Sequence, residues 1–502
     1  RVRGLGQTSS ASTAAREARE RLPSPSATTW LCRFVKDLPR PFCGSADVIA
    51  ARESTLGLLP RDAFEALVLP DAHLLASLAR LVVVRQIEDA RAPDERRRAG
   101  HDRTFAFLPL VAGDMVPRLL RRLRRELRHH GTATTLDAAG FDTLYGKPGT
   151  AQTPSTDLFA PAVAEWLDDK EARTDAMLYI GSPTWDSWTQ RVVNRADRVV
   201  LVVPAATDDA SLRDVERRLS ALFADVRWRP RLDLLLLHAA DIERPSRTAR
   251  WLTERRVDDF HHVRMDDPGH LARLARRLTN RARGLVFSGG GARGYAHLGV
   301  QRLIEERDVR IDCIGGSSMG ALLGAAMAMG HDHASVSSLS ARFASRRALF
   351  DYTLPIVSLM RSAKLSRFCR EVYGDTRIED LWTPFFAISS NLANGRTVVH
   401  DRGPLWHVVR SSISLPGLFS PVPTEAGELL IDGAVLDGFP VHAMLERLGG
   451  QGHLIGVNVS HVPERFERFD YGTSLSGWRV LRSRLVPFAA RIDVPRLAET
   501  LL

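Results

Sequence analysis

The clearest pattern along the chain is an alternation of short apolar runs with longer segments in which apolar residues recur every three or four positions. Between Thr104 and about Arg281 the short runs predict strands and the longer segments predict helices. Strands that alternate with helices are typical of a parallel sheet covered by helices. The four predicted strands are Thr104–Leu110, Ala176–Ile180, Arg198–Val203 and Leu232–Leu237.

One helix of this region, predicted over Val116–His130, is strongly basic and amphipathic. Its leucines form one stripe, and six arginines surround that stripe. Such a helix either packs its leucines on a sheet and solvates its arginines, or lies on an acidic membrane surface. Packing on the sheet is the more frequent arrangement, and we favour it here. The stripe consists of Leu119, Leu120, Leu123 and Leu127.

A second α/β pattern begins near Arg283. It predicts a strand over Gly284–Phe287, a glycine loop, a helix over about Tyr295–Arg307 and a strand over Ile311–Gly315. The next helix, Met319–Gly330, is apolar all round, so we expect it to be buried. Further along the chain, Phe385–Ser390 and Leu429–Ile431 predict two more strands.

The turn between the second of these strands and the apolar helix reads Gly-Ser-Ser-Met-Gly, a G-x-S-x-G pattern centred on Ser318. In a strand-to-helix elbow of this kind the serine hydroxyl is held in the open on a strained turn. Gly316 and Gly320 allow the backbone to double back without clashes of side chains. The positive end of the helix dipole favours negative charge at this point. Ser318 is therefore the candidate nucleophile.

The glycine loop supplies the other half of a candidate site. Gly289, Gly290 and Gly291 offer successive backbone amides near the end of the neighbouring strand. Acyl transfer needs such donors, directed at the oxygen that becomes an oxyanion. Arg293 and Gly294 complete a G-G-G-x-R-G pattern, in which the arginine is expected to brace the loop.

An alternative interpretation of the same loop is dinucleotide binding, because Gly289, Gly291 and Gly294 also satisfy G-x-G-x-x-G. A Rossmann site requires an acidic residue at the end of the second strand. Here the second strand opens with Asp312 and ends in the serine elbow, which disfavours this interpretation. No cofactor is expected.

Together the two motifs resemble those of the patatin-like phospholipases, in particular the bacterial relatives of neuropathy target esterase. The resemblance covers roughly Thr104–His461 and includes a distant aspartate, Asp432, in the Ile-Asp-Gly-Ala segment with Gly433 as its glycine. It implies an α/β fold: a three-layer α/β/α patatin-like domain preceded by a smaller α/β domain. Two departures from the family pattern are Ala434, in place of a commoner glycine, and Asp437-Gly438, in place of Asn-Asn.

The resemblance also implies a catalytic dyad, in which Asp432 takes the proton of Ser318 directly. The competing arrangement is a triad of the α/β-hydrolase type, since three histidines follow Asp432 in the chain. None of them lies in a context that matches a triad signature. These histidines are His442, His453 and His461. His297, after the glycine loop, is interpreted as a residue that packs or caps its helix.

Composition narrows the classes of partner. The 502 residues carry a net charge of +10, and almost all the positive charge is arginine. Such a surface favours anionic lipid headgroups, phosphorylated substrates or, without sequence specificity, nucleic acid. An equally good explanation of the high arginine content is a GC-rich genome. The four cysteines are scattered and show no metal-ligand spacing, so neither disulfides nor a metal site is expected. No signal peptide and no membrane-spanning run is recognised. These features fit a cytoplasmic protein with peripheral membrane contact.

The predicted domains follow the pattern changes along the chain. Residues 1–44 are interpreted as disordered or degenerate, and 45–90 resemble the end of a cyclic-nucleotide-binding domain. That remnant lacks the phosphate-binding cassette, so cyclic-nucleotide binding is not expected. Residues 104–281 form an α/β domain of unassigned chemistry, 283–463 the patatin-like catalytic domain and 464–502 a C-terminal extension.

The function expected from these observations is serine acyl hydrolysis of lipid esters, of the lysophospholipase or phospholipase type. Two alternatives remain open: a soluble carboxylesterase or thioesterase with the same dyad, and a catalytically idle regulatory protein. The stretch Gly330–Gly374 contains several apolar residues that look exposed, including Tyr352, Leu354 and Ile356. It is interpreted as a lid or acyl-chain pocket, or as an ordinary helical insertion.

Overall fold

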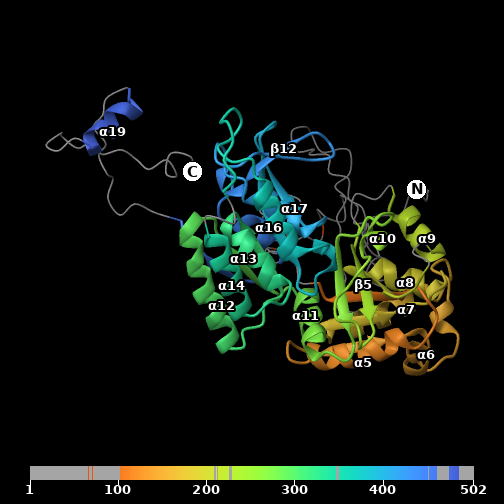
Figure 1. Cartoon of the computed structure of the whole chain (residues 1–502). Helices are drawn as coiled ribbons and strands as arrows, with labels where there is room; N and C mark the ends of the chain where they lie inside the picture. Colours follow the sequence, from red (N-terminus) through yellow and green to blue (C-terminus); the bar gives the residue numbers. More distant parts are fainter. Residues whose placement is uncertain are drawn as a thin grey trace. The chain divides into compact units, whose positions relative to one another are not determined.

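The computed structural model (Figure 1) describes residues 66, 70–71, 102–208, 211, 213–224, 229–345, 350–449, 452–460 and 474–485. The interpretations of residues 1–44 and 45–90 therefore fall outside the described residues, apart from three positions. Of the predicted C-terminal extension, only α19 (Gly477–Leu485) and the three residues before it are described.

The described chain divides into two compact units. The first comprises the described residues up to 204 together with 211–236 and 256–261. The second comprises those in 205–210, in 237–255 and from 262 onward. Each contains helices and parallel strands, as the predicted α/β class requires.

The first sheet has six strands in the order β2-β3-β1-β4-β5-β6, and β1 pairs in parallel with both β3 and β4. The four predicted strands are all present, and β2 and β6 were missed. β2 is short and only half-buried, and β6 carries polar residues within its run, so neither has an apolar pattern. The strands are β1 (Thr104–Pro109), β2 (Ala133–Leu136), β3 (Ala176–Ile180), β4 (Arg198–Pro204), β5 (Arg231–His238) and β6 (Asp259–Arg264).

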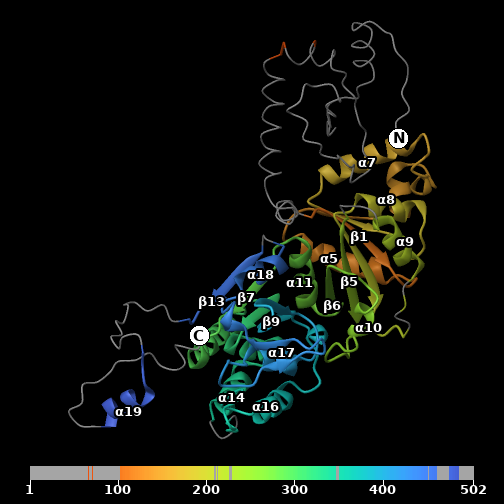
Figure 2. The ribbon, with the colours of Figure 1, turned by 90° about the horizontal axis from the view of Figure 1, so that it is seen from above.

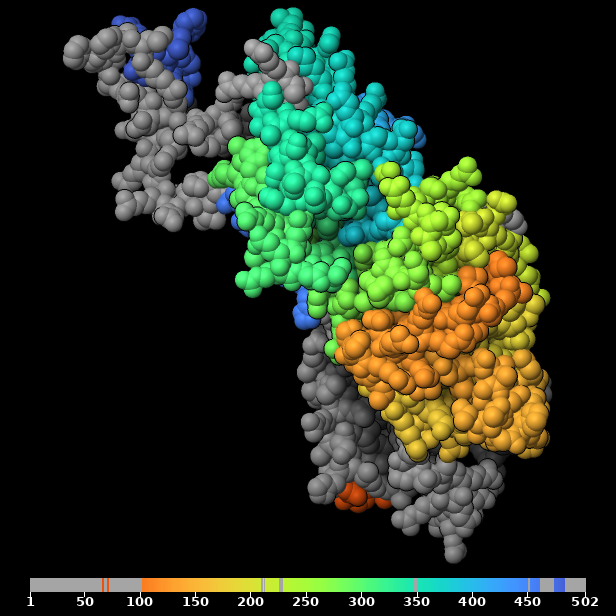
Figure 3. Space-filling model, turned by 60° about the horizontal axis from the view of Figure 1, so that its bottom comes forward, coloured from red at the N-terminus to blue at the C-terminus, as the bar shows by residue number. Residues whose placement is uncertain are grey.

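The basic helix α5 (Met115–Leu127) was expected either to pack its leucines on the sheet or to lie on a membrane surface. Its buried residues are Val116 and the four leucines of the stripe, so the apolar face is packed inside the protein. Packing on the sheet is thus confirmed, and the leucines are not available to a membrane. The orange atoms of this part of the chain form the near surface of the first unit in Figure 3. The other helices before β7 are α6 (Ala138–Tyr145), η1 (Thr150–Gln152), α7 (Ala160–Ala172), α8 (Ser187–Arg195), α9 (Asp214–Phe223), α10 (Ala249–Leu252) and α11 (Pro268–Leu278).

The second sheet has seven strands. Six follow the order β11-β12-β9-β8-β7-β13, and β10 also pairs with β9. The four strands β13, β7, β8 and β9 run parallel, whereas β10 and β12 are antiparallel to β9. The strands are β7 (Arg283–Phe287), β8 (Cys313–Ser317), β9 (Phe385–Asn391), β10 (Arg396–His400), β11 (Val422–Pro423), β12 (Leu429–Asp432) and β13 (His453–Val457).

Side chains of these strands alternate between two hydrophobic clusters, one on each face of the sheet. Phe287, Ile314 and Phe385 pack on one face against the helices α13, α16 and α17. Val286 and Phe386 pack on the other face, against α18. Figure 2 shows α18 on one side of β7, β9 and β13, and α14, α16 and α17 on the other. The second unit therefore has the three-layer α/β/α arrangement that was predicted.

The helices of this part are η2 (Gly291–Ala296), α12 (His297–Glu306), α13 (Met319–Ala328), α14 (His333–Ala344), α16 (Ala363–Tyr373), η3 (Ile378–Asp380), α17 (Leu405–Ser412), η4 (Gly433–Val435) and α18 (Val441–Arg447). Helix α13 is buried on all sides, as its apolar sequence predicted. In the part of the chain that the structure describes, none of the helices is both long and apolar enough to cross a bilayer.

Candidate active site

Ser318 lies at the elbow between β8 and α13. Its backbone has φ 52° and ψ −121°, a conformation that residues other than glycine rarely adopt. The elbow is tight on both sides: a Cβ at Gly316 would lie 2.5 Å from the backbone of Gly320, and one at Gly320 would lie 2.4 Å from the carbonyl oxygen of Phe287. Both positions therefore require glycine. The predicted strained turn is present, and it presents the Ser318 hydroxyl at the N-terminus of α13.

Asp432 is the direct partner of that hydroxyl. Ser318 Oγ donates a hydrogen bond of 2.7 Å to Asp432 Oδ2, across 114 positions of the chain. The sheet makes this contact, because β9 pairs with β8 on one side and with β12, which ends at Asp432, on the other. The second carboxylate oxygen, Oδ1, accepts a hydrogen bond of 2.8 Å from the Ala434 amide.

The environment of Asp432 sets its protonation. Burial raises the pKa of its carboxyl group to about 6, although the hydrogen bonds from Ser318 and the Ala434 amide act in the opposite direction. A carboxyl group with such a pKa is largely ionised at neutral pH and is still a stronger base than an exposed aspartate.

Within the described residues, no histidine hydrogen-bonds to Ser318 or Asp432. His442 is exposed and lies 3.3 Å from Glu446 on its own helix, and His453 is an exposed residue at the start of β13. His461 lies outside the described residues. The geometry thus brings the serine and the aspartate together without an intervening imidazole.

The three glycines predicted as oxyanion donors do not share one environment. The Gly289 amide donates to the carbonyl oxygen of Gly438 at 2.8 Å, so it is already engaged. Within the described residues the amides of Gly290 and Gly291 make no such bond. The Arg293 side chain is exposed, and it is its backbone amide that closes the loop, by donating to Gly290 O at 3.1 Å.

Close packing holds this glycine loop against the elbow. A Cβ at Gly294 would lie 2.2 Å from Met319 Cγ, and one at Gly289 would lie 2.9 Å from Ala434 Cβ. Gly433 is equally constrained, since its Cβ would lie 2.3 Å from Ile388 O. These three glycines therefore let the loop, the elbow and the aspartate segment approach one another.

Two contacts of the site were not foreseen from the sequence. Ser412, at the end of α17, accepts a hydrogen bond of 3.0 Å from the Ser318 amide and donates one of 2.6 Å to Ile388 O. It thereby ties the elbow to the neighbouring strand β9. Gly438, one of the two departures from the family pattern, fixes the glycine loop through its carbonyl oxygen. The role of Ser412 could not be predicted, because nothing in the sequence distinguishes it from the neighbouring serines at the end of α17.

His297 has the packing role that was expected of it. Its ring is buried, stacks on Phe287 with centroids 4.4 Å apart, and donates through Nε2 to Ser288 O at 2.9 Å. Ser288 in turn accepts a hydrogen bond from the Val459 amide, which attaches the chain beyond β13 to the start of the glycine loop.

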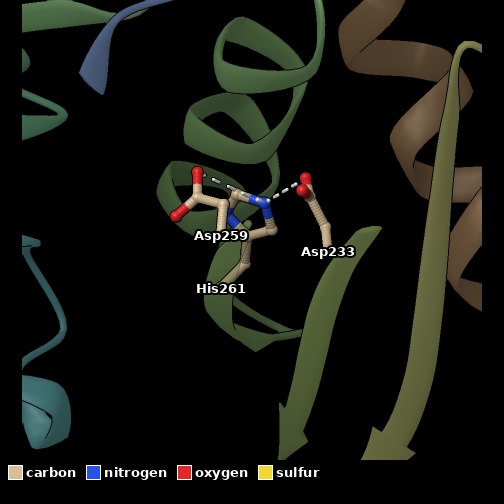
Figure 4. Close-up of side chains that lie close together, drawn as sticks. All are labelled: Asp233, Asp259 and His261. Carbon is tan, nitrogen blue, oxygen red and sulfur yellow. Dashed lines mark hydrogen bonds and ion pairs between the residues drawn. The ribbon is translucent and has the colours of Figure 1, made fainter. Parts of the chain in front are cut away.

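Among the described residues, one group of side chains lies close enough together to be considered as a metal site. It consists of Asp233, Asp259 and His261 in the first unit (Figure 4). However, Asp233 Oδ2 accepts from Arg198 Nη1 at 2.9 Å and lies 3.0 Å from His261 Nε2. Burial would raise the pKa of Asp233, but the Arg198 charge and the His261 hydrogen bond outweigh it and hold that pKa below its usual value. The permanent charge of Arg198 disfavours a cation here, and we interpret the group as a buried ion-pair network.

The loop between β1 and α5 is the place where a phosphate-binding loop would lie in a parallel α/β unit. It reads Leu-Val-Ala-Gly-Asp over residues 110–114 and contains neither lysine nor a hydroxyl residue. Asp114 stands at the N-cap of α5, where its negative charge would repel a phosphate. We infer no nucleotide chemistry for the first unit.

Comparison with known proteins agrees with this architecture. Residues 285–445 match the patatin-like phospholipase family, and residues 102–288 match the P-loop-like domain of the neuropathy target esterase family. The chain thus carries a patatin-like phospholipase domain preceded by a domain found in neuropathy target esterases.

Individual proteins are similar to most of this chain. The chain is 28% identical to lysophospholipase NTE1 of Candida albicans, over 91% of this chain and 37% of that protein. It is 30% identical to lysophospholipase NTE1 of Yarrowia lipolytica, over 90% of this chain and 36% of that protein. The chain therefore spans little more than a third of the length of these relatives. Among solved structures, VipD from Legionella pneumophila is similar over 31% of this chain and 46% of its own, with 15% identity and a TM-score of 0.25, too low to support an inference.

Proposed function

We propose that this chain hydrolyses carboxylic esters of lipids through a Ser318–Asp432 dyad. The observation that carries the proposal is the direct hydrogen bond between Ser318 Oγ, on a strained elbow, and the buried carboxylate of Asp432. A serine hydroxyl is a weak nucleophile and needs such an adjacent base. The intact pair also argues against a catalytically idle regulatory protein.

The geometry supports the following chemistry. Asp432 Oδ2 accepts the Ser318 proton while Oγ attacks the ester carbonyl carbon, and the carbonyl oxygen becomes an oxyanion. The free amides of Gly290 and Gly291 donate to that oxyanion, which lowers the energy of the tetrahedral intermediate. Collapse breaks the ester bond, and the leaving alkoxide takes the proton from Asp432. Water then gives a proton to Asp432 and attacks the carbonyl carbon of the acyl-enzyme. Collapse breaks the bond between that carbon and Ser318 Oγ, which takes the proton back from Asp432, and the fatty acid leaves.

Lipid monoesters, lysophospholipids first, are the substrates that we propose. The two relatives reported above are named lysophospholipases, and the patatin-like match covers Ser318 and Asp432 alike. The test is fatty-acid release by the purified chain from lysophosphatidylcholine, phosphatidylcholine, triacylglycerol and a short soluble ester, with fluorophosphonate-treated protein as the blank. We expect release from the lysophospholipid, and a rate that increases above its critical micelle concentration. Rapid turnover of the soluble ester alone would instead indicate a carboxylesterase.

The pH dependence follows from the environment of Asp432. Only the carboxylate can accept the Ser318 proton, and burial raises the pKa of this group to about 6. We therefore expect kcat/KM to fall about tenfold per pH unit below about pH 6 and to be level above about pH 7, with a single ionisation. Initial rates measured from pH 4.5 to 8 with a soluble ester check this, and a midpoint near pH 4 would contradict it.

Unfolding of the protein at low pH would also abolish activity. We therefore ask whether protonation of Asp432 stabilises or destabilises the folded state. The pKa of Asp432 is higher in the folded chain than its usual value of 3.8. Between pH 3.8 and about 6 the folded state therefore binds this proton more tightly than the unfolded chain does, and protonation of Asp432 stabilises the fold. A thermal-unfolding midpoint that does not fall over the pH range of the activity loss would assign the loss to the dyad.

A further inference from the structure

The second unit carries an apolar hairpin, residues 351–361, between α14 and α16. Its segment 352–359 reads Tyr-Thr-Leu-Pro-Ile-Val-Ser-Leu and contains no charged residue. Four of its large side chains are mostly exposed, although exposed apolar residues usually occur singly. They are Tyr352 at 77%, Leu354 at 73%, Ile356 at 81% and Val357 at 69%.

The hairpin is held in a fixed conformation by its own hydrogen bonds. Tyr352 and Met360 form an antiparallel bridge, and the Thr353 amide donates to Leu359 O at 3.1 Å. At the base, the Arg361 amide donates to Asp351 O at 2.9 Å. The exposed tip is thus preformed and does not have to be ordered when it meets a partner, which reduces the entropic cost of binding.

The base of the hairpin is joined to the segment that leads to the candidate site. The amides of Leu359 and Met360 donate to Gly417 O and Leu418 O at 2.8 and 2.9 Å. That segment follows Ser414, whose carbonyl oxygen accepts from the Asp432 amide at 2.9 Å. The exposed apolar tip and the dyad therefore belong to one continuous hydrogen-bonded structure.

Basic residues follow the tip directly. Arg361 has an exposed side chain, 3.9 Å from Asp351, and Lys364 and Arg367 are exposed on the first turns of α16. An apolar tip next to basic side chains suits an anionic lipid surface, because the apolar residues enter the acyl-chain boundary while the cations meet the headgroups.

We propose that the hairpin 351–361 inserts its tip into an anionic lipid surface and so places the Ser318 site against the substrate-containing layer. The inference rests on the proposed function for the choice of a lipid partner. It assigns a role to Tyr352, Leu354, Ile356 and Val357, which the chemistry at Ser318 does not use. The partner is a membrane or micelle that contains lipids with negatively charged headgroups.

The test measures binding to vesicles without any need for catalysis. The full chain carrying Ser318→Ala is sedimented with sucrose-loaded vesicles of phosphatidylcholine, with and without phosphatidylserine. Adding Ile356→Asp and Val357→Asp is expected to lower the partition coefficient at least about tenfold, since two carboxylates would have to enter the apolar boundary. Adding Leu303→Asp, which alters an exposed leucine on α12, is the matched control and should change it less than twofold.

A second measurement separates docking from folding and from the proposed activity. With Ser318 present, the double variant should hydrolyse a short soluble ester at the rate of the parent chain and melt at the same temperature, while its activity on vesicle-borne lipid falls with binding.

Unchanged sedimentation of the double variant, or no binding of the parent chain to either vesicle, would overturn the proposal. So would a change of oligomeric state in light scattering without a change in vesicle binding, which would indicate a contact between copies. Loss of vesicle binding in a chain that hydrolyses no lipid would leave the docking surface standing and reject the proposed function alone.

Discussion

Replacing Ser318 by alanine is expected to abolish covalent labelling by a fluorophosphonate probe and to lower ester hydrolysis by on the order of a millionfold, as loss of the nucleophile does in other serine hydrolases. The reason is geometric, because Ser318 Oγ is the hydroxyl that contacts the base and stands on the elbow. Gel-based labelling and initial rates of ester hydrolysis measure the two effects.

Ser317 provides the matched control for this substitution. It precedes the nucleophile directly but is fully buried, and a Cβ at Gly433 would lie 2.6 Å from its Oγ. A Ser317→Ala chain should therefore keep its labelling. Persistent labelling of Ser318→Ala at another mapped serine would refute the assignment of the nucleophile.

The substitution Asp432→Asn should slow acylation of Ser318 by roughly 10²–10⁴-fold, the usual contribution of a positioned general base. Asparagine has the shape of aspartate and can keep the hydrogen bond from the Ala434 amide, but its amide group cannot take up the serine proton. The rate of labelling by a fluorophosphonate, followed over time, reports acylation directly.

Control variants accompany this experiment. Asp401→Asn removes a carboxylate of the same unit that pairs with Arg447, and His442→Ala and His453→Ala remove the two described histidines that a triad could have used. All three should keep most of the rate, and so should His461→Ala. A loss of several orders of magnitude in any histidine variant would favour a triad over the dyad.

The sequence predicted the strained elbow because that part of the candidate site is local. The elbow around Ser318 and the glycine loop are continuous motifs whose conformations follow from their glycines. Strand β8 was placed two residues too early, at Ile311–Gly315 instead of Cys313–Ser317. The reason is that its glycines have weak strand propensity, yet they are needed because a Cβ at Gly315 would lie 2.2 Å from the Phe386 ring.

The hydrogen bonds that support the elbow and the glycine loop could not be predicted from local motifs, because they join segments that are distant in the sequence. Ser412 reaches the Ser318 amide across 94 positions, and Val459 reaches Ser288 across 171. Without the sheet order, neither residue differs from others of its type. The hydrogen bond from the Gly289 amide to Gly438 O also joins distant segments. It leaves the amides of Gly290 and Gly291 as the oxyanion donors that we propose.

The attachment of Val459 to Ser288 affects the order in which the candidate site is assembled during synthesis. During synthesis the chain emerges from its N-terminus, so the elbow and the glycine loop exist long before β12, Gly438 and β13 are available to complete them. Contacts of such long range also form late in folding, because the closure of large loops has to precede them. A nascent chain that ends before residue 459 therefore carries both recognisable motifs and lacks a finished site. If the proposed function holds, a growing chain gains esterase activity only after residue 459 has been made.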